Sequence, residues 1–284
     1  MYLLRFRNSE NQVRVAAEVD SRTYDLAASE EVSLTSILES KHPLDTVQKL
    51  IDAAGTPTEL EDNSRLCPIE AQEVWAAGVT YMRSKKARME ESDFSAIAYD
   101  KVYEADRPEI FFKSIASKVV GSQEAVGIRA DATWNVPEPE LTFVMNSKGA
   151  IAGYTIGNDM SSRDIEGENL LYLPQAKVYD RSAAIGPRIR IGVEEEEVRS
   201  WTIGITIERN GKPVFQGSTS VDQIKRSFHE LASYLFRSQT FPSGVMLMTG
   251  TGVVPDESFT LTQGDKIRID VSGIGTLINH VITV

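Results

Sequence analysis

Pro137-Glu138-Pro139-Glu140-Leu141 is the stretch from which the rest of the sequence can be interpreted. In an extended segment, residues two apart project from the same face, so Glu138 and Glu140 are expected to present two carboxylates to one point. The flanking prolines remove backbone donors, which favours an edge or rim position in a sheet. Two like charges held together repel, and a hard cation is the usual remedy. An isolated Glu-x-Glu pair is more often a solvated acidic edge, so the spacing alone leaves both interpretations open.

A third carboxylate stands in the stretch that follows, GYTIGNDMSSRDIEGENLLYLPQAKVYDRSAAIGP at residues 153–187. Asp159 comes shortly after the apolar run Ile151–Ile156, near the expected end of a strand. A carboxylate from a second strand end completes an anionic triad that leaves room for waters and a substrate. Because the chain has one cysteine and three histidines, a metal site here has to be rich in oxygen ligands.

From Glu73 onward the pattern is mainly that of β-strands. Short β-branched runs are separated by Gly, Pro, Asn and Asp, as expected of strands joined by turns. The expected strands are Val74–Val79, Leu141–Met145, Ile151–Ile156, Thr202–Arg209 and Lys266–Val271. Asn210-Gly211 predicts a hairpin turn. Val221–Phe236 has apolar residues at the spacing of one amphipathic helix.

The first part of the chain has a pattern of its own, with alternating strand-like runs followed by helical ones. The strand-like runs are Tyr2–Phe6 and Val13–Val19, and the helical runs are Ser33–Lys41, with a Ser/Thr cap, and Pro43–Ala54. The polar segment Thr56–Cys67 is interpreted as a linker. We therefore expect an α+β protein, with a small N-terminal α/β domain at residues 1–65 and a β-rich catalytic domain at residues 72–284.

Composition and charge narrow the class of protein. Hydrophobic residues make up 41% and charged residues 25% of the 284, which is typical of a globular protein with a sizeable core. The net charge of −11 has no basic cluster against it, which disfavours nucleic acid and anionic membranes as partners. No apolar run is long enough to span a bilayer, and MYLLRFRNSE does not resemble a signal peptide. The lone Cys67 excludes an internal disulfide and suits a reducing cytoplasm.

Several motifs together resemble the core signature of the fumarylacetoacetate hydrolase superfamily. That signature is a Glu-x-Glu pair, then an Asp within G-Y-x-x-x-N-D-x-[ST]-x-R-D, then a Lys before a segment that ends in Gly-Pro. Its elements stand here as Glu138, Glu140, Gly153, Tyr154, Asn158, Asp159, Ser161, Arg163, Asp164, Lys177, Gly186 and Pro187. Phe111–Ser114 and the later stretches 248–253, 263–265 and 273–279 agree with the same family. The resemblance covers roughly residues 72–284.

The resemblance implies a fold, a cofactor and roles for single residues. It implies a mixed β-roll, usually assembled as a homodimer. Glu138, Glu140 and Asp159 would ligate Mg²⁺ or Mn²⁺, with Ca²⁺ as a further alternative. Lys177 would steady a developing enolate oxygen beside the metal. Arg163 and Asp164 would form a buried ion pair beneath the site. Thr251 would bind a substrate carboxylate, or alternatively would only form part of a turn.

The segment 77–91 bears on the type of reaction. Hydrolytic members that resemble acylpyruvases carry a His–Glu pair there to activate water, and this chain has no histidine in that segment. The stretches WAAGVTYMRSKKAR, YDKVYEADRPEIFFK, WNVPEPELTFV and NLLYLPQAKVYD are instead similar to the branch of 2-keto-3-deoxy-D-arabinonate dehydratase. The resemblance implies loss of water from a 2-keto-3-deoxy sugar acid through a metal-stabilised enolate, giving a 2-oxo acid semialdehyde. Arg83 and Ser84 would bind the substrate, and Lys177, Glu109 or a metal-bound hydroxide would transfer protons.

Two other functions remain open from the sequence. The same metal triad serves C–C hydrolases, decarboxylases and isomerases that act on acylpyruvate-type 2-oxo acids, because a family fold does not determine the chemistry. A non-catalytic sugar-acid binding protein could also keep the fold. A complete set of repelling carboxylates together with Lys177 argues against a merely structural remnant.

Overall fold

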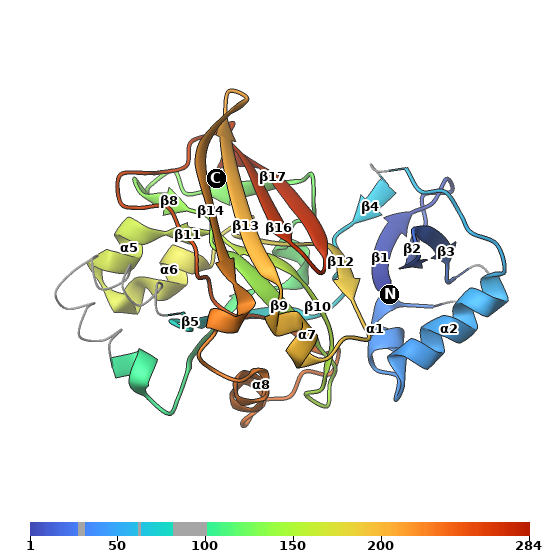
Figure 1. Cartoon of the computed structure of the whole chain (residues 1–284). Coiled ribbons are helices and arrows are strands. Elements are labelled where there is room, and N and C mark those ends of the chain that lie inside the picture. Colours follow the sequence, from blue (N-terminus) through green and yellow to red (C-terminus); the bar gives the residue numbers. More distant parts are fainter. Residues whose placement is uncertain (28–31, 62–63, 82–100) are drawn as a thin grey trace.

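The computed structural model describes residues 1–27, 32–61, 64–81 and 101–284, and its architecture is α+β with strands predominating (Figure 1). The largest sheet contains, in spatial order, β3 (Arg22–Asp25), β2 (Val13–Val19), β1 (Tyr2–Arg7), β12 (Ala183–Arg190), β10 (Ile151–Asp159), β9 (Pro139–Met145), β15 (Val245–Met248), β5 (Glu73–Gly78) and β6 (Glu109–Ser114), with β4 (Arg65–Leu66) paired to β1. Its pairs are antiparallel except β15 with β5, which run parallel.

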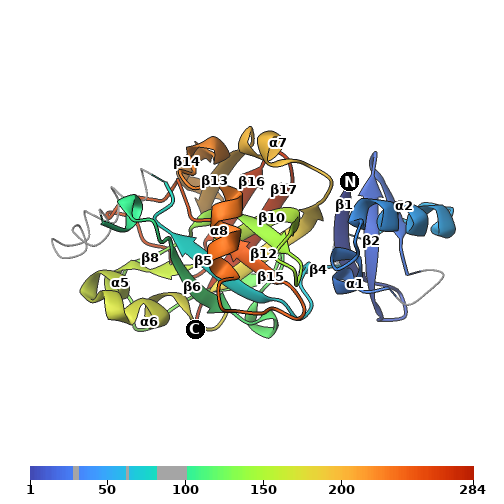
Figure 2. The same ribbon diagram turned by 90° about the horizontal axis from the view of Figure 1, so that it is seen from below.

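A second sheet contains β14 (Lys212–Ser220), β13 (Thr202–Arg209), β16 (Lys266–Val271), β17 (Gly275–Thr283) and β7 (Ala125–Ile128). A short pair joins β8 (Asn135–Val136) to β11 (Ser161–Ser162). The α-helices with bounds inside the described residues are α1 (Leu34–Leu38), α2 (Pro43–Ala54), α5 (Arg163–Glu168), α6 (Leu173–Lys177), α7 (Glu195–Arg199) and α8 (Phe228–Leu235). Figure 2 shows α8 lying over the large sheet.

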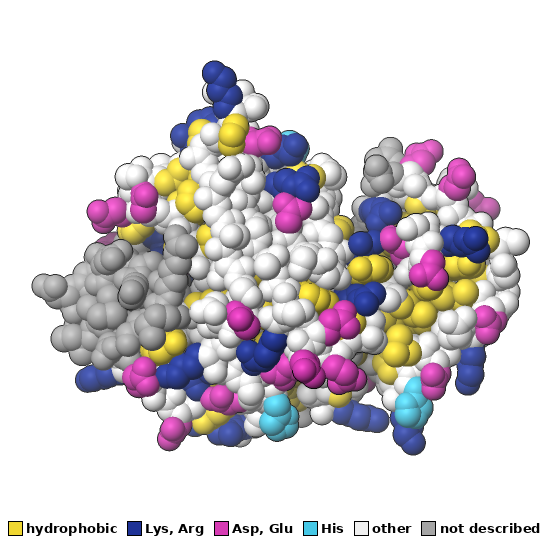
Figure 3. Space-filling model, in the orientation of Figure 1, with side chains coloured by type: hydrophobic (Ala, Val, Ile, Leu, Met, Phe, Trp, Pro, Cys, Tyr) yellow, Lys and Arg dark blue, Asp and Glu magenta, His cyan; other side chains and the backbone are white. Residues whose placement is uncertain are grey.

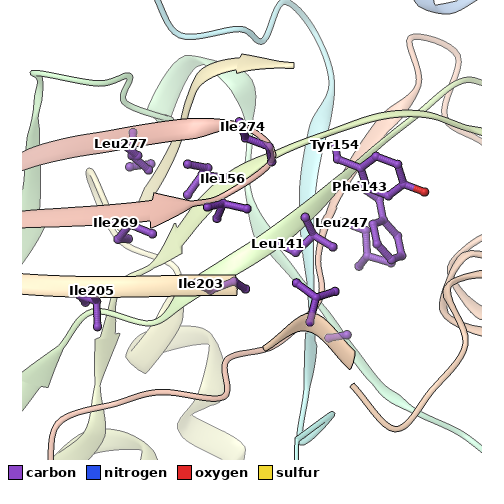
Figure 4. Packing of buried hydrophobic residues seen from close by; sticks show 14 of the residues in the cluster. Leu141, Phe143, Tyr154, Ile156, Ile203, Ile205, Leu247, Ile269, Ile274 and Leu277 are labelled. Atoms are coloured by element: carbon purple, nitrogen blue, oxygen red, sulfur yellow. The ribbon is translucent and has the colours of Figure 1, made fainter. Parts of the chain in front are cut away.

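Strand β9 is buried over its whole length, which explains its nearly continuous apolar sequence. Its alternate residues Leu141 and Phe143 face the second sheet and pack in one apolar cluster with Ile203 and Ile269 (Figure 4). Val144 points the other way, into a second cluster. The period of two therefore places Glu140 on the same face as Val144, away from the cluster between the sheets.

The large sheet curls on itself. The chain that follows β6 reaches β12, several strands away in the same sheet, where Val120 forms a β-bridge with Ala184. The Val120 amide donates to the Ala183 carbonyl, and the Ile185 amide donates to the Val120 carbonyl. The face that carries Val144 thus becomes the inside of a roll. The carboxylates of β9 and β10 lie at one end of this roll.

The N-terminal part continues the large sheet. β1 pairs antiparallel with β12, with Tyr2 opposite Arg190, and the apolar cluster inside the roll also includes Leu3 and Val47. The division of the chain into domains at residues 65–72 stays a prediction, and both sheet and core run across it.

Two expectations for local structure are wrong, and a third, the edge or rim position of the Glu-x-Glu segment, is met in only one of its two forms. The segment interpreted as a linker contains β4, which pairs with β1. The Glu-x-Glu segment is at a rim but not at a sheet edge, since β9 lies between β10 and β15 and Pro139 is its first residue. The predicted helix Val221–Phe236 is broken, because Ile224 is extended and α8 begins only after the N-cap Ser227.

Acidic and basic side chains are mixed over the face shown in Figure 3 and do not gather into a field of one sign. No helix within the described part of the chain is long and apolar enough to cross a bilayer.

Candidate metal centre

Strands β9 and β10 bring three carboxylates together. Glu138 and Glu140 share one face at the start of β9, and Asp159 ends β10, where its amide donates to the carbonyl of Glu138 at 2.9 Å. Carboxylate oxygens of all three residues lie within 4.8 Å of one another. Each of the three residues is at most 3% exposed. The triad predicted from spacing and resemblance is therefore assembled, and it is buried.

Three cationic side chains surround this triad. The Lys177 ammonium, from the end of α6, lies 2.7 Å from Glu138 Oε2 and 3.1 Å from Asp159 Oδ2. The Arg163 guanidinium lies 2.7 Å from Glu138 Oε1. The expected ion pair of Arg163 with Asp164 is wrong, because the Asp164 carboxylate instead accepts from the backbone and hydroxyl of Thr133. Arg163 neutralises a carboxylate of the site itself.

Lys113 is the third cation, and its role was not deduced from the sequence. Its wholly buried ammonium lies 2.5 Å from Asp159 Oδ1 and donates to the carbonyls of Met160 and Lys177 at 2.9 and 2.5 Å. Burial lowers the pKa of Lys113, and the charge of Asp159 opposes this. The sequence signal that could have indicated this role is the single lysine in Phe111-Phe112-Lys113. In a strand, Lys113 lies on the same face as Glu109, four residues before it, and this face is turned inward.

Glu140 differs from the other two carboxylates. In the described part of the chain no lysine or arginine forms an ion pair with it, and its Oε2 accepts from the Gly250 amide at 2.6 Å. Burial, and then the charges of Asp159 and Glu138, raise the pKa of Glu140 well above its usual range. A buried carboxylate that has no ion-pair partner among the described residues, beside two more, is a donor set that a small divalent cation satisfies. The site therefore fits Mg²⁺, and all three predicted ligands belong to it.

A pocket lies over the triad, and its wall includes Gly78, Val79, Glu109, Phe111, Gly250 and Thr251, together with Lys177. Gly78 is opposite Glu109 in the pairing of β5 with β6, and a Cβ on Gly78 would overlap the Glu109 carboxylate. A side chain at position 78 would therefore move the Glu109 carboxylate from its present place in the pocket. The structure brings Glu109, Lys177 and Thr251 to one cavity with the three carboxylates.

The predicted substrate contacts are placed only in part. The Thr251 hydroxyl donates to the Val253 carbonyl at 3.0 Å, so it is engaged in its own turn and the backbone is the remaining group for a substrate. Arg83 and Ser84 lie outside the described residues. The roles of these three residues stay predictions.

Comparison with known proteins gives the family. Residues 73–282 match the sequence profile of the family described as "Fumarylacetoacetate (FAA) hydrolase C-terminal". With the roll and the buried carboxylate triad, this shows that the chain belongs to the fumarylacetoacetate hydrolase superfamily, as its motifs indicated.

Individual relatives are more specific. The chain is 43% identical over 279 residues to a probable 2-keto-3-deoxyxylonate dehydratase of Haloferax volcanii, covering 98% of this chain and 94% of the relative. It is 42% identical over 217 residues to the 2-dehydro-3-deoxy-D-arabinonate dehydratase of Saccharolobus solfataricus, covering 75% and 73%. A solved structure of 2-keto-3-deoxy-D-arabinonate dehydratase, "complexed with magnesium and 2,5-dioxopentanoate", is 33% identical with a TM-score of 0.83, covering 100% of this chain and 99% of that one.

Proposed function

We propose that this protein is a magnesium-dependent hydro-lyase that removes water from a five-carbon 2-keto-3-deoxy sugar acid and yields 2,5-dioxopentanoate. The observation that carries the proposal is one pocket in which the buried triad, Lys177 and Glu109 face a common space. The 42–43% identical relatives are named as dehydratases of such acids, and the magnesium-containing neighbour holds this product.

Glu138, Glu140 and Asp159 would hold a Mg²⁺ ion, which would supply Lewis acidity toward a 2-oxo acid. The chain's own residues supply the rest. Lys177 keeps a positive charge beside the triad, 2.7 Å from Glu138, where negative charge develops on the 2-oxo oxygen as carbon 3 loses a proton. Glu109, which lines the same pocket, accepts and returns protons.

The overall change balances. Carbon 3 loses a proton, and the carbon 4 hydroxyl leaves with a proton as water. A hydrogen then leaves carbon 5 as a proton while carbon 3 regains one, which leaves an enol between carbons 4 and 5. The enol hydroxyl loses its proton as carbon 4 gains one, which gives the aldehyde at carbon 5. No oxidant takes part, because the oxidation at carbon 5 is matched by the reduction at carbon 4. This sequence needs a group that moves protons, and it needs no activated water.

Proton NMR of the products in deuterated buffer tests the reaction. The substrates are a 2-keto-3-deoxy pentonate, an acylpyruvate and oxaloacetate, each with Mg²⁺ and with a chelator. We expect the pentonate to give the semialdehyde with deuterium at carbon 3, at a higher kcat/KM than any other conversion. Cleavage of the acylpyruvate to a free acid, or decarboxylation of oxaloacetate, at a higher kcat/KM would assign the protein to the runner-up chemistry. Binding of the pentonate without turnover would make it a sugar-acid binding protein.

We also propose that the protein works in the cytoplasm as a homodimer or higher homo-oligomer. The lone Cys67 supports a reducing compartment, and the family resemblance supports the assembly. Light scattering coupled to size exclusion measures the mass in solution, and a species of 31.4 kDa would contradict the oligomer.

A further inference from the structure

The short segment Ile224-Lys225-Arg226 interrupts the predicted helix and holds two other parts of the chain. Ile224 forms a β-bridge with Tyr81, and the Lys225 amide donates to the Thr80 carbonyl at 3.0 Å. These contacts fix the chain where it leaves β5, directly after the pocket residues Gly78 and Val79. The side chains of the same segment reach in another direction, to residues 102–106.

Arg226 makes the stronger of the side-chain contacts. It is 8% exposed, and its guanidinium donates to the carbonyls of Val102, Ala105 and Asp106 at 3.3, 2.6 and 3.1 Å. Residues 101–104 are helical, so the guanidinium lies at a helix C-terminus, where carbonyls lack partners and a cation is favoured. Glu230 of α8 pairs with the same guanidinium at 2.5 Å. Because one buried guanidinium donates to three carbonyls of residues 102–106, it holds this turn in a defined position.

Lys225 adds a second connection. Its ammonium donates to the Tyr103 carbonyl at 2.7 Å and lies 4.1 Å from the centre of the Tyr103 ring. It also pairs with Glu104 at 3.0 Å. Because the lysine side chain is 39% exposed, solvent screens this ion pair. Together the two cations fix both the backbone and the ring of Tyr103.

The fixed turn contacts the pocket at two places. The Tyr103 ring packs on Val79, and both residues are buried in one small apolar cluster. Val79 is a β-branched residue with φ +53°, a conformation that persists only when the surroundings hold it. The second connection is the chain itself, because Glu109 comes three residues after the Asp106 carbonyl that Arg226 holds.

We infer that Arg226, assisted by Lys225, is a positioning residue of this active site, and this rests on the proposed role of Glu109. Arg226 fixes the turn in which Tyr103 packs on Val79. The same turn determines where β6 begins, and therefore where Glu109 lies in the pocket. Arg226 touches neither the triad nor the substrate. Its removal therefore displaces the part of the wall that contains Val79 and Glu109 and leaves the three carboxylates of the triad in place.

The test compares Arg226→Gln with Arg209→Gln. Arg209 is a suitable control, because it also makes forked contacts, to Asp265 at 2.8 Å and to the Thr260 carbonyl at 2.9 Å, and it lies on the second sheet away from the pocket. We expect Arg226→Gln to lower kcat by roughly 10- to 100-fold, as a displacement of about 1 Å does, and to change Mg²⁺ affinity by less than about threefold. Arg209→Gln should leave kcat near that of the parent protein.

Amide hydrogen exchange reports the position of the wall without any turnover. Exchange in peptides that cover residues 76–81 and 107–113 should rise in Arg226→Gln and not in Arg209→Gln. Unchanged exchange there, or an equal rise throughout the β9 and β10 peptides with loss of Mg²⁺ binding, would overturn the inference. The second result would make Arg226 a general stability residue.

A double-mutant cycle decides whether Arg226 acts through Glu109. If it does, Arg226→Gln should lower the residual kcat of the Glu109→Gln protein by less than about threefold. The same fold-loss in both backgrounds would overturn the inference and leave the proposed function intact. Full activity of Glu109→Gln by itself would instead contradict the proposed role of Glu109.

Discussion

Gly250 joins the backbone of the pocket to the metal triad, and Gly250→Ala is therefore a sharp test of how the site is built. Gly250 has φ +90°, in which alanine is strained by roughly 1–2 kcal/mol. Its new Cβ would overlap the Thr80 hydroxyl and lie 2.9 Å from the Ala77 carbonyl oxygen. Thr80 cannot yield freely, because its hydroxyl donates to the Thr249 carbonyl at 2.6 Å. The Gly250 amide also donates to Glu140, a charge-assisted bond of about 1.5–3 kcal/mol.

Gly264→Ala isolates the backbone part of this effect. Gly264 has φ +91° and nothing within 4 Å of a built Cβ. We expect Gly264→Ala to lower the free energy of unfolding by about 1–2 kcal/mol, and Gly250→Ala to lower it by about 3–5 kcal/mol once the disturbed hydrogen bonds are included. The gap of about 2–3 kcal/mol corresponds to roughly 4–12 °C in Tm.

Thermal unfolding of the metal-free proteins measures the gap, and calorimetric titration with Mg²⁺ measures the site. Because Gly250 orients a metal ligand, Mg²⁺ affinity should fall by about 10- to 100-fold in Gly250→Ala and stay unchanged in Gly264→Ala. Equal destabilisation of the two variants together with unaltered Mg²⁺ affinity would show that Gly250 does not orient Glu140 for the metal.

Two further predictions concern Lys177 and the buried tyrosines. Lys177→Met should lower kcat by about a hundredfold or more while changing Mg²⁺ affinity much less, whereas Lys118→Met, on an exposed lysine, should change neither; turnover of Lys177→Met within a few-fold of the parent would make the assignment wrong. Burial raises the pKa of Tyr154 to about 12 and raises the pKa of Tyr81 and Tyr179 further from the ordinary value of 10.0. The unfolded chain therefore binds fewer protons than the folded one above about pH 10, so the free energy of unfolding should fall as pH rises there. Absorbance at 295 nm should show these phenols ionising late, and ionisation of all nine tyrosines together near pH 10 would contradict this.

Local sequence patterns were sufficient for elements whose signals lie within them. The helix Pro43–Ala54 and the strand Thr202–Arg209 have the predicted bounds, because a helical or alternating apolar face identifies each one. Asn210 and Gly211 adopt the left-handed conformations, φ +53° and +73°, that a tight hairpin needs. The Glu-x-Glu spacing likewise gave the shared face of Glu138 and Glu140.

Contacts between distant residues explain what the sequence did not give. The apolar spacing of Val221–Phe236 suits a helix, but Ile224 forms a β-bridge with Tyr81. The chain is therefore extended at Ile224, and the helix is interrupted there. Lys113 meets Asp159 only because the large sheet curls into a roll. No local pattern in the sequence states either partner.

Metal-dependent dehydration at the carboxylate triad is tested most directly by reconstituting the metal-stripped protein with Mg²⁺. Dehydration of the 2-keto-3-deoxy pentonate and calorimetric binding are followed on the same sample. We expect no measurable dehydration without metal, recovery that saturates together with binding at one ion per chain, and loss of both in Glu140→Gln with its fold intact. Full dehydration by the stripped protein, or by Glu140→Gln, would contradict this expectation.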